Sequence, residues 1–261
     1  MKSLDTSHQY TDEFQSKYFP FILVLFSSTW LISTISAVKI VNFLGLTLTG
    51  GFVLFPITSI LSSLIADVYG YKGSRQAIWC GTMVNLTYVL FINIVNQVPA
   101  SPYWTLANEF QAILIPQTRL IFASIIGFWL SGFISSYSMS KLKIRGLELT
   151  SRILLASFLS ITVDISIYFS LGIFGTIPLS IFKQLFFFAY FKKIICELLF
   201  LPVIWKLIDL AKNVEGFEIY DMNTNFTPFS IDNVYNLSDY RKIQVNKEHE
   251  TLKQELRIED R

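Results

Sequence analysis

Six long apolar stretches, separated by short segments that hold most of the charges, constrain this chain more than any other feature. They cover residues 19–37, 50–68, 77–95, 119–139, 153–173 and 182–207. About 20 apolar residues are enough for a helix to cross a bilayer, and lipid cannot hydrogen-bond an open backbone. The composition agrees, with 52% apolar and only 15% charged residues. The sequence therefore predicts an all-α membrane protein with six transmembrane helices.

The basic residues between these stretches predict the orientation. If the N-terminus is inside, the cytoplasmic segments hold Lys2, Lys17, Lys72, Arg75, Lys141, Lys143, Arg145, Arg152, Lys206 and Lys212, and the opposite connectors hold little beyond Lys39, Arg119 and Lys183. The positive-inside rule then places both termini in the cytoplasm. The expected parts are a cytoplasmic segment 1–18, a six-helix transmembrane domain 19–210 and a cytoplasmic tail 211–261. The mixed charges of the tail favour a short exposed helix or disorder. Acidic residues precede the first stretch, which favours a retained helix over a signal peptide.

Several functional classes find no support in the sequence. The net charge is +2 and the basic residues are not interleaved with aromatic ones, so a nucleic-acid partner is not expected. Both histidines, His8 and His249, lie in the polar ends, and Cys80 and Cys196 lack metal-ligand spacing. Motifs for nucleotide, ester or zinc-dependent peptide hydrolysis are not visible. We therefore expect neither an enzyme nor a metal or cofactor site.

The second stretch carries polar residues at helical spacing. One face of this helix would hold small or polar side chains, namely Ser59, Ser62, Ser63, Ala66 and Asp67. Small residues let neighbouring helices approach closely, which is the structural explanation for the serines. Asp67 is either an interfacial carboxylate paired with Lys72 or Arg75, or part of a polar site.

Charged residues also interrupt the fifth and sixth stretches. Asp164 lies near the middle of the fifth, where an aspartate costs about 2.5–3.5 kcal/mol and so must face a protein or water-filled interior. In the sixth, Lys192 and Lys193 are followed by Glu197. Lys193 and Glu197 either neutralise each other one turn apart or contact Asp164 or a polar ligand.

Two further features lie near the outer interface. The connector 96–117 is rich in proline and almost uncharged, and Tyr103 and Trp104 there are typical of an interfacial aromatic belt, with a lid over a substrate entrance as the alternative. Arg119 either anchors its helix at this interface or serves as a ligand. The combination of mid-membrane charges, serines and aromatic rings indicates passage of a polar, planar solute, with Phe55 or Trp79 as candidate stacking residues.

The stretch FPITSILSSLIADVYGYKGSRQAIW resembles the queuosine precursor transporter family, also called the vitamin uptake transporter or YhhQ-type family. The matching features are Lys39, Gly45 to Thr49, Phe55 and Pro56, Asp67 to Gly70, Lys72, Arg75 and Trp79. Downstream, the likeness continues at Arg119, Ala123, Ser124, Arg152, Asp164, Lys193 and Pro202, and in the tail segment EGFEIYDMNTNFTPF.

The resemblance implies a fold similar to the substrate-binding components of vitamin transporters. It implies uptake of 7-cyano-7-deazaguanine, 7-aminomethyl-7-deazaguanine or queuine across a bacterial inner membrane for transfer RNA modification. The chain departs from the family pattern at Ser63, where an aspartate is expected, at Asp67, where many members have glutamate, and at Thr34, where asparagine is common. Together, residues and resemblance give the candidate substrate-binding residues Asp67, Asp164, Lys193, Glu197, Ser63, Phe55, Trp79 and Arg119.

Two alternatives to this interpretation stay open. The chain could capture a vitamin-like solute for a separate ATPase partner, or it could be a membrane enzyme or a scaffold. The expected partners are a deazapurine and the lipid bilayer. Protons are a candidate coupling ion, and the sequence allows a homo-oligomer.

Overall fold

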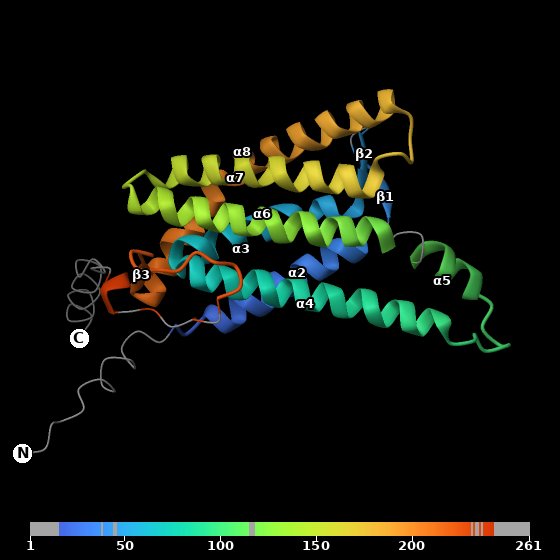
Figure 1. Cartoon of the computed structure of the whole chain (residues 1–261), viewed down its shortest axis with the longest axis horizontal. Coiled ribbons are helices and arrows are strands. Elements are labelled where there is room, and N and C mark those ends of the chain that lie inside the picture. The colour runs from blue at the N-terminus through green and yellow to red at the C-terminus, as the bar shows by residue number, and fades with distance from the viewer. Residues whose placement is uncertain are drawn as a thin grey trace, which may run out of the picture.

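In a computed structural model of the chain, the six apolar stretches form a bundle of long helices (Figure 1). The structure describes residues 16–37, 39–43, 46–114, 118–230, 232, 235 and 237–242. The helices are α2 (Phe19–Ser36), α3 (Phe55–Val68), α4 (Gly70–Gln97), α5 (Ala107–Leu114), α6 (Thr118–Ile144), α7 (Leu149–Ile167) and α8 (Leu179–Glu215). A π-helical turn, Tyr168–Ile173, extends α7.

Short antiparallel strand pairs mark the two ends of the bundle (Figure 1). Strands β1 (Ile40–Phe43) and β2 (Leu46–Thr49) form a hairpin with Ile40 opposite Thr49, and a 3₁₀ turn, Gly50–Val53, follows it. At the other end, β3 (Phe217–Ile219) pairs with β4 (Tyr240–Lys242), which follows a 3₁₀ turn at Leu237–Asp239. We call these the hairpin end and the tail end.

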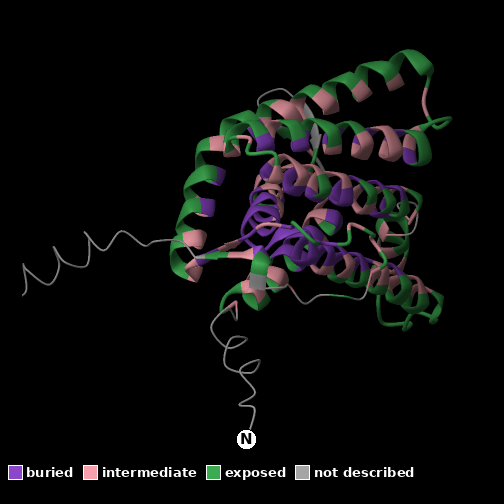
Figure 2. Cartoon of the chain, turned by 60° about the vertical axis from the view of Figure 1, so that its left-hand side comes forward, coloured by how far each residue is buried: buried purple, intermediate pink, exposed green. Residues whose placement is uncertain are grey.

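The helices have the apolar surface of a membrane protein. Among the described residues, four stretches are long and apolar enough to cross a membrane: Phe19–Ser36, Gly70–Gln97, Ala107–Ile144 and Leu149–Ile173. Helix α3 is apolar but shorter, and α8 has the length but carries charges along it. Large apolar side chains such as Phe21, Phe91 and Leu199 are exposed, and exposed residues cover the outer faces of the helices (Figure 2). The chain is thus an all-α membrane protein with six membrane helices.

Helix boundaries differ from the expected ones at the tail end. Helix α4 begins at Gly70 rather than 77, because Gly70 adopts a positive φ of 65° and makes a tight turn out of α3. Helix α8 runs eight residues past the expected 207, to Glu215, and ends at Gly216, whose φ is 76°. The expected exposed helix or disorder is wrong for the described part of the tail, which packs against the bundle. Residues 243–261, with the final HETLKQELRIEDR, lie outside the described residues.

The core that supports the interior lies where α2, α3, α4 and α8 meet. Helix α6 packs between α4 and α7, while α3 packs on α8. A buried cluster including Phe26, Trp30, Ile65 and Ile204 fills the centre. Gly81 of α4 lets the Trp30 ring approach, since any side chain at this position would collide with the indole. This packing fixes Trp30 at the edge of the internal cavity.

Candidate functional site

A cavity of about 410 Å³ lies inside the bundle between α2, α3, α6, α7 and α8. Its lining comes from the last turns of α2, the first half of α3 and the first half of α8, together with Thr49 and Gly51 beside the hairpin. The cavity therefore lies in the half of the bundle nearer the hairpin end. Its volume is within the range of about 300–1,000 Å³ that small-molecule sites occupy. Serine hydroxyls dominate the polar lining, at Ser33, Ser59, Ser62, Ser63, Ser124, Ser131, Ser135, Ser157 and Ser160.

An ion pair between α7 and α8 faces this cavity. The Lys193 ammonium donates a hydrogen bond to the Asp164 carboxylate, and the two side chains are 25% and 16% exposed. Lys193 also lies 5.0 Å from the centroid of the Phe55 ring on α3, a cation–π contact. The pair is therefore neither sealed in the core nor free. It presents a donor and an acceptor side by side to the cavity.

A close contact between α6 and α7 positions Asp164. Gly127 of α6 faces it, and a Cβ atom there would lie 2.9 Å from Asp164 Oδ1 and 3.1 Å from its backbone oxygen. Glycine therefore lets the two helices approach closely here, because a larger residue would force Asp164 or the helices to shift. Small residues serve this purpose at many membrane-helix contacts.

Glu197 lies one helical turn after Lys193 and is 4% exposed. Its carboxylate accepts hydrogen bonds from Ser157 Oγ of α7, at 2.7 Å, and from Ser59 Oγ of α3. Among the described residues, no ion pair involves Glu197. The local Lys193–Glu197 pair considered from sequence is not formed, because Lys193 pairs with Asp164 instead.

Aromatic side chains form the apolar part of the wall. Trp30 and Phe128 stack with ring centroids 4.0 Å apart, and both line the cavity together with Phe55, Tyr168 and Phe169. Planar faces and scattered hydrogen-bonding groups suit a flat, polar heterocycle. Within the described part of the chain, no group of histidine, cysteine, aspartate or glutamate side chains could hold a metal ion.

Asp67 lies in a second polar cluster, at the tail end, and does not line the cavity. It is fully buried, with Oδ1 2.6 Å from Arg152 Nη1 and Oδ2 2.7 Å from Lys212 Nζ. Lys143 Nζ donates to the Asp67 backbone oxygen at 2.6 Å. Glu218 of β3 completes the cluster, 3.0 Å from Lys143 and 2.6 Å from Lys212. Lys72 and Arg75, which the sequence suggested as partners of Asp67, contact the tail instead.

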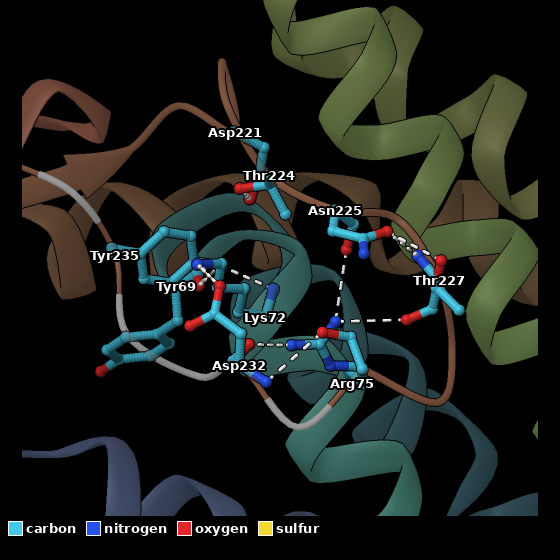
Figure 3. Close-up of polar contacts among 10 residues, drawn as sticks. Tyr69, Lys72, Arg75, Asp221, Thr224, Asn225, Thr227, Asp232 and Tyr235 are labelled. Atoms are coloured by element: carbon cyan, nitrogen blue, oxygen red, sulfur yellow. Dashed lines mark hydrogen bonds and ion pairs between the residues drawn. The ribbon is translucent and has the colours of Figure 1, made fainter.

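Lys72 and Arg75 hold the tail against α4 (Figure 3). Lys72 Nζ lies 2.7 Å from the Asp232 carboxylate, and the Lys72 backbone N–H donates to the Tyr235 hydroxyl at 2.6 Å. The Arg75 guanidinium donates to the carbonyls of Asn225, at 3.3 Å, and Thr227, at 3.2 Å, and to that of Asp232. Both basic side chains are buried, although the sequence placed them in water.

The remaining candidates, Trp79 and Arg119, also lie away from the cavity. Trp79 Nε1 donates to the carbonyl of Pro228 at 2.9 Å, so this ring belongs to the tail contact. Arg119 donates to the carbonyls of Leu171, at 2.8 Å, and Phe174, at 3.0 Å, at the hairpin end of α7. The structure thus gathers five of the eight candidates around the cavity: Asp164, Lys193, Glu197, Ser63 and Phe55.

Sequence reasoning missed Gly127 and, apart from Phe55, the aromatic wall. Trp30 and Phe128 belong to stretches in which aromatic residues also face lipid, so composition gives no signal for them. Ser157, by contrast, was recognisable, because it precedes Asp164 by seven residues and so shares its helix face.

Comparison with known families agrees with the architecture. A family model described as "Putative vitamin uptake transporter" matches residues 49–207. This range covers more than half of the chain, from the end of β2 to the last third of α8, and includes the cavity residues of α3, α6, α7 and α8. No match was found among curated proteins or solved structures. The cavity, the six membrane helices and this match agree, and the chain belongs to the vitamin uptake transporter family.

Proposed function

We propose that this protein imports a queuosine precursor, namely 7-cyano-7-deazaguanine, 7-aminomethyl-7-deazaguanine or queuine, for transfer RNA modification. The observation that carries the proposal is the Asp164–Lys193 pair, which borders the cavity beside stacked aromatic rings. A mid-membrane ion pair that faces a cavity is typical of a solute pathway.

The chemistry of a deazaguanine base fits this arrangement. Its pairing edge offers two neighbouring N–H donors and one carbonyl acceptor. A carboxylate can accept from both donors while an ammonium or hydroxyl group donates to the carbonyl. Asp164 and Lys193 supply this combination, and Trp30, Phe128 and Phe55 offer faces for the ring. The departure at Ser63 leaves a hydroxyl group where an aspartate was expected, and this hydroxyl lines the cavity.

The proposed direction of transport follows from the charges. With both termini in the cytoplasm of a bacterium, the hairpin end faces outward and the cavity receives solute from outside. The buried Asp67 cluster then closes the cytoplasmic end, where Arg152, Lys143 and Lys212 join three helices to α3. Transport requires this cluster to rearrange so that the solute can leave.

Uptake in cells tests the proposal. In a strain unable to make the precursor, expression of the wild-type chain should restore queuosine-modified transfer RNA at low external precursor. Asp164→Asn removes the charge that holds Lys193 and should abolish restoration while the protein still inserts. The matched control is Asp209→Asn, the same change at an exposed carboxylate of α8, which should behave as wild type. Failure of all three bases to restore the modification with the wild-type chain would reject the proposal.

Reconstitution separates this function from the capture alternative. Purified protein alone in lipid vesicles should move the base across the membrane. A chain that binds the base but moves none without an ATPase partner would instead be a capture component.

A further inference from the structure

Glu197 is a buried carboxylate that the substrate pair does not use. It lies at the centre of α8, lines the cavity and is 4% exposed. Within the described part of the chain, its carboxylate accepts hydrogen bonds from two neutral hydroxyls, Ser157 Oγ at 2.7 Å and Ser59 Oγ. Three helices, α3, α7 and α8, therefore converge on one carboxylate inside the membrane region.

The charges around the cavity leave this carboxylate without a counter-ion in contact. The charged groups of the lining are Asp164 on α7 and Lys192, Lys193 and Glu197 on α8, and its other titratable groups are Tyr168 on α7 and Cys196 on α8. The described lining residues of α2, α3 and α6 add none. Lys193 is engaged with Asp164. Lys192 lies five positions before Glu197, about 140° around the helix, and forms no ion pair with it within the described part of the chain.

An ionised carboxylate in this position is costly, and a proton removes the cost. Burial in a medium of low polarity penalises a charge that has no close partner, and two hydroxyl donors compensate only in part. Carboxylates with these surroundings are where transporters bind and release protons. Glu197 lines the same cavity as Thr49 and Gly51, which lie beside the hairpin.

We propose that Glu197 is the proton-binding site that couples solute uptake to a proton gradient. This inference rests on the proposed function. The carboxylate binds one proton from the outer side, together with the solute at the Asp164–Lys193 pair, and releases that proton to the cytoplasm when the cavity opens there. Lys193 and Glu197 are one turn apart on the same face of α8. Binding of the solute at Lys193 therefore changes the electrostatic interaction at Glu197, and protonation of Glu197 changes that at Lys193.

The experiment uses purified protein in lipid vesicles that contain a pH-sensitive dye, with 7-cyano-7-deazaguanine as the probe. Two activities are measured: exchange of labelled for unlabelled base without a gradient, and accumulation driven by an inward proton gradient. With one proton per solute, a gradient of about one pH unit drives about tenfold accumulation. Wild-type protein should show exchange, accumulation and acidification of the vesicle interior.

Glu197→Gln keeps the shape of the side chain but cannot release a proton. It should retain exchange, and accumulation and acidification should be lost. Accumulation by Glu197→Gln would overturn the proposal. Loss of exchange together with accumulation would also overturn it, since Glu197 would then be a ligand of the solute. If the wild-type protein exchanged none of the three bases, the proposed function itself would be rejected.

A second variant keeps the proposal testable if Glu197→Gln does not fold. Ser157→Ala removes one hydrogen bond to the ionised carboxylate and leaves Glu197 in place. The pH dependence of accumulation should then shift toward higher pH, because the charged form has lost a stabilising donor. Thr162→Ala, at an exposed position of α7 outside the cavity, is the matched control, since the Thr162 hydroxyl donates to the Phe158 carbonyl rather than to Glu197. An unchanged pH profile in Ser157→Ala would contradict the assignment.

Discussion

The ammonium group of Lys193 makes several contacts at once. It neutralises Asp164, contacts the Phe55 ring and lies in the cavity wall. Asp164 depends on this contact, because an aspartate at mid-membrane without a cation is expensive. Glu197, only one turn away, relies on hydroxyl groups instead. Asp164 and Glu197 therefore have different surroundings in the same cavity. These surroundings suit Asp164 to binding the solute and Glu197 to binding a proton.

Neutralising Lys193 tests the dependence of Asp164 on it. Lys193→Gln should lower the stability of the protein in detergent by about 1–3 kcal/mol, less than the loss for a fully sealed pair, because the cavity admits water. Adding Asp164→Asn should recover most of this loss, since no charge then lacks a partner. Both proteins should fail in uptake. Thermal unfolding followed by tryptophan fluorescence gives the stabilities, and a double variant no more stable than Lys193→Gln would contradict the ion-pair explanation.

At the scale of elements, the contact between α6 and α7 determines where Asp164 points. Gly127→Ala adds a methyl group that would lie 2.9 Å from Asp164 Oδ1, so the helices must separate or the carboxylate must turn away. Uptake should fall strongly while the protein still inserts. Ile126→Ala, the adjacent exposed position of α6, is the control and should leave uptake near wild type. Normal uptake by Gly127→Ala would show that Asp164 does not need its present orientation.

The membrane helices were predictable from sequence, whereas the tail contact was not. Apolar runs of sufficient length indicate helices because lipid permits little else. The cost of burying Asp164 placed it correctly in an interior. The same reasoning misplaced Lys72 and Arg75, because short-range patterns cannot show that residues more than 140 positions later cover them. It also grouped Asp67 with the substrate residues, whereas the structure surrounds Asp67 with Arg152, Lys143 and Lys212.

The docking of the tail on α4 depends on the forked side chain of Arg75. The Arg75 guanidinium donates to the carbonyls of Asn225 and Asp232, which lie on the two sides of the tail loop. The shorter glutamine side chain cannot reach both carbonyls. Arg75→Gln should make the segment 216–230 more susceptible to chymotrypsin in detergent, so this segment should be cleaved faster than in the wild-type protein. Arg145→Gln, at an exposed arginine near the same end, should keep the wild-type cleavage rate. Equal resistance of both variants would show that Arg75 does not secure the tail.

For the whole molecule, the arrangement separates two polar systems. The cavity at the hairpin end contains the ionisable groups that can meet a solute, and the tail end contains a compact cluster of Asp67, Lys143, Arg152, Lys212 and Glu218. This cluster joins α3, α6, α7, α8 and β3. The tail is therefore part of the closure of this end, and loss of its contacts should loosen the ends of several helices together.

Glu218 links the tail strand β3 to this closure, and its ionisation gives a pH-dependent test. Burial raises the pKa of Glu218, but the charge of Lys143 and the hydrogen bond and charge of Lys212 outweigh it and lower the pKa to about 2. Because the pKa is depressed in the folded protein, the ionised group stabilises the fold above its ordinary pKa of 4.5. This stabilisation is lost as the pH falls from that value toward 2.

Glu218→Gln should therefore destabilise the protein near neutral pH by about 1.5–3 kcal/mol, the usual contribution of hydrogen bonds to charged groups. The difference in melting temperature between wild type and variant should stay constant from about pH 7 to about pH 5. It should shrink below that, because Glu218 then becomes protonated in the unfolded wild-type chain, while in the folded protein it stays ionised until the pH approaches 2. Glu109→Gln, in α5 and outside the cluster, corrects for other acid effects. A difference that persisted unchanged in acid would mean that β3 is held by packing rather than by the charge of Glu218, and that the tail end stays closed without its ion pairs.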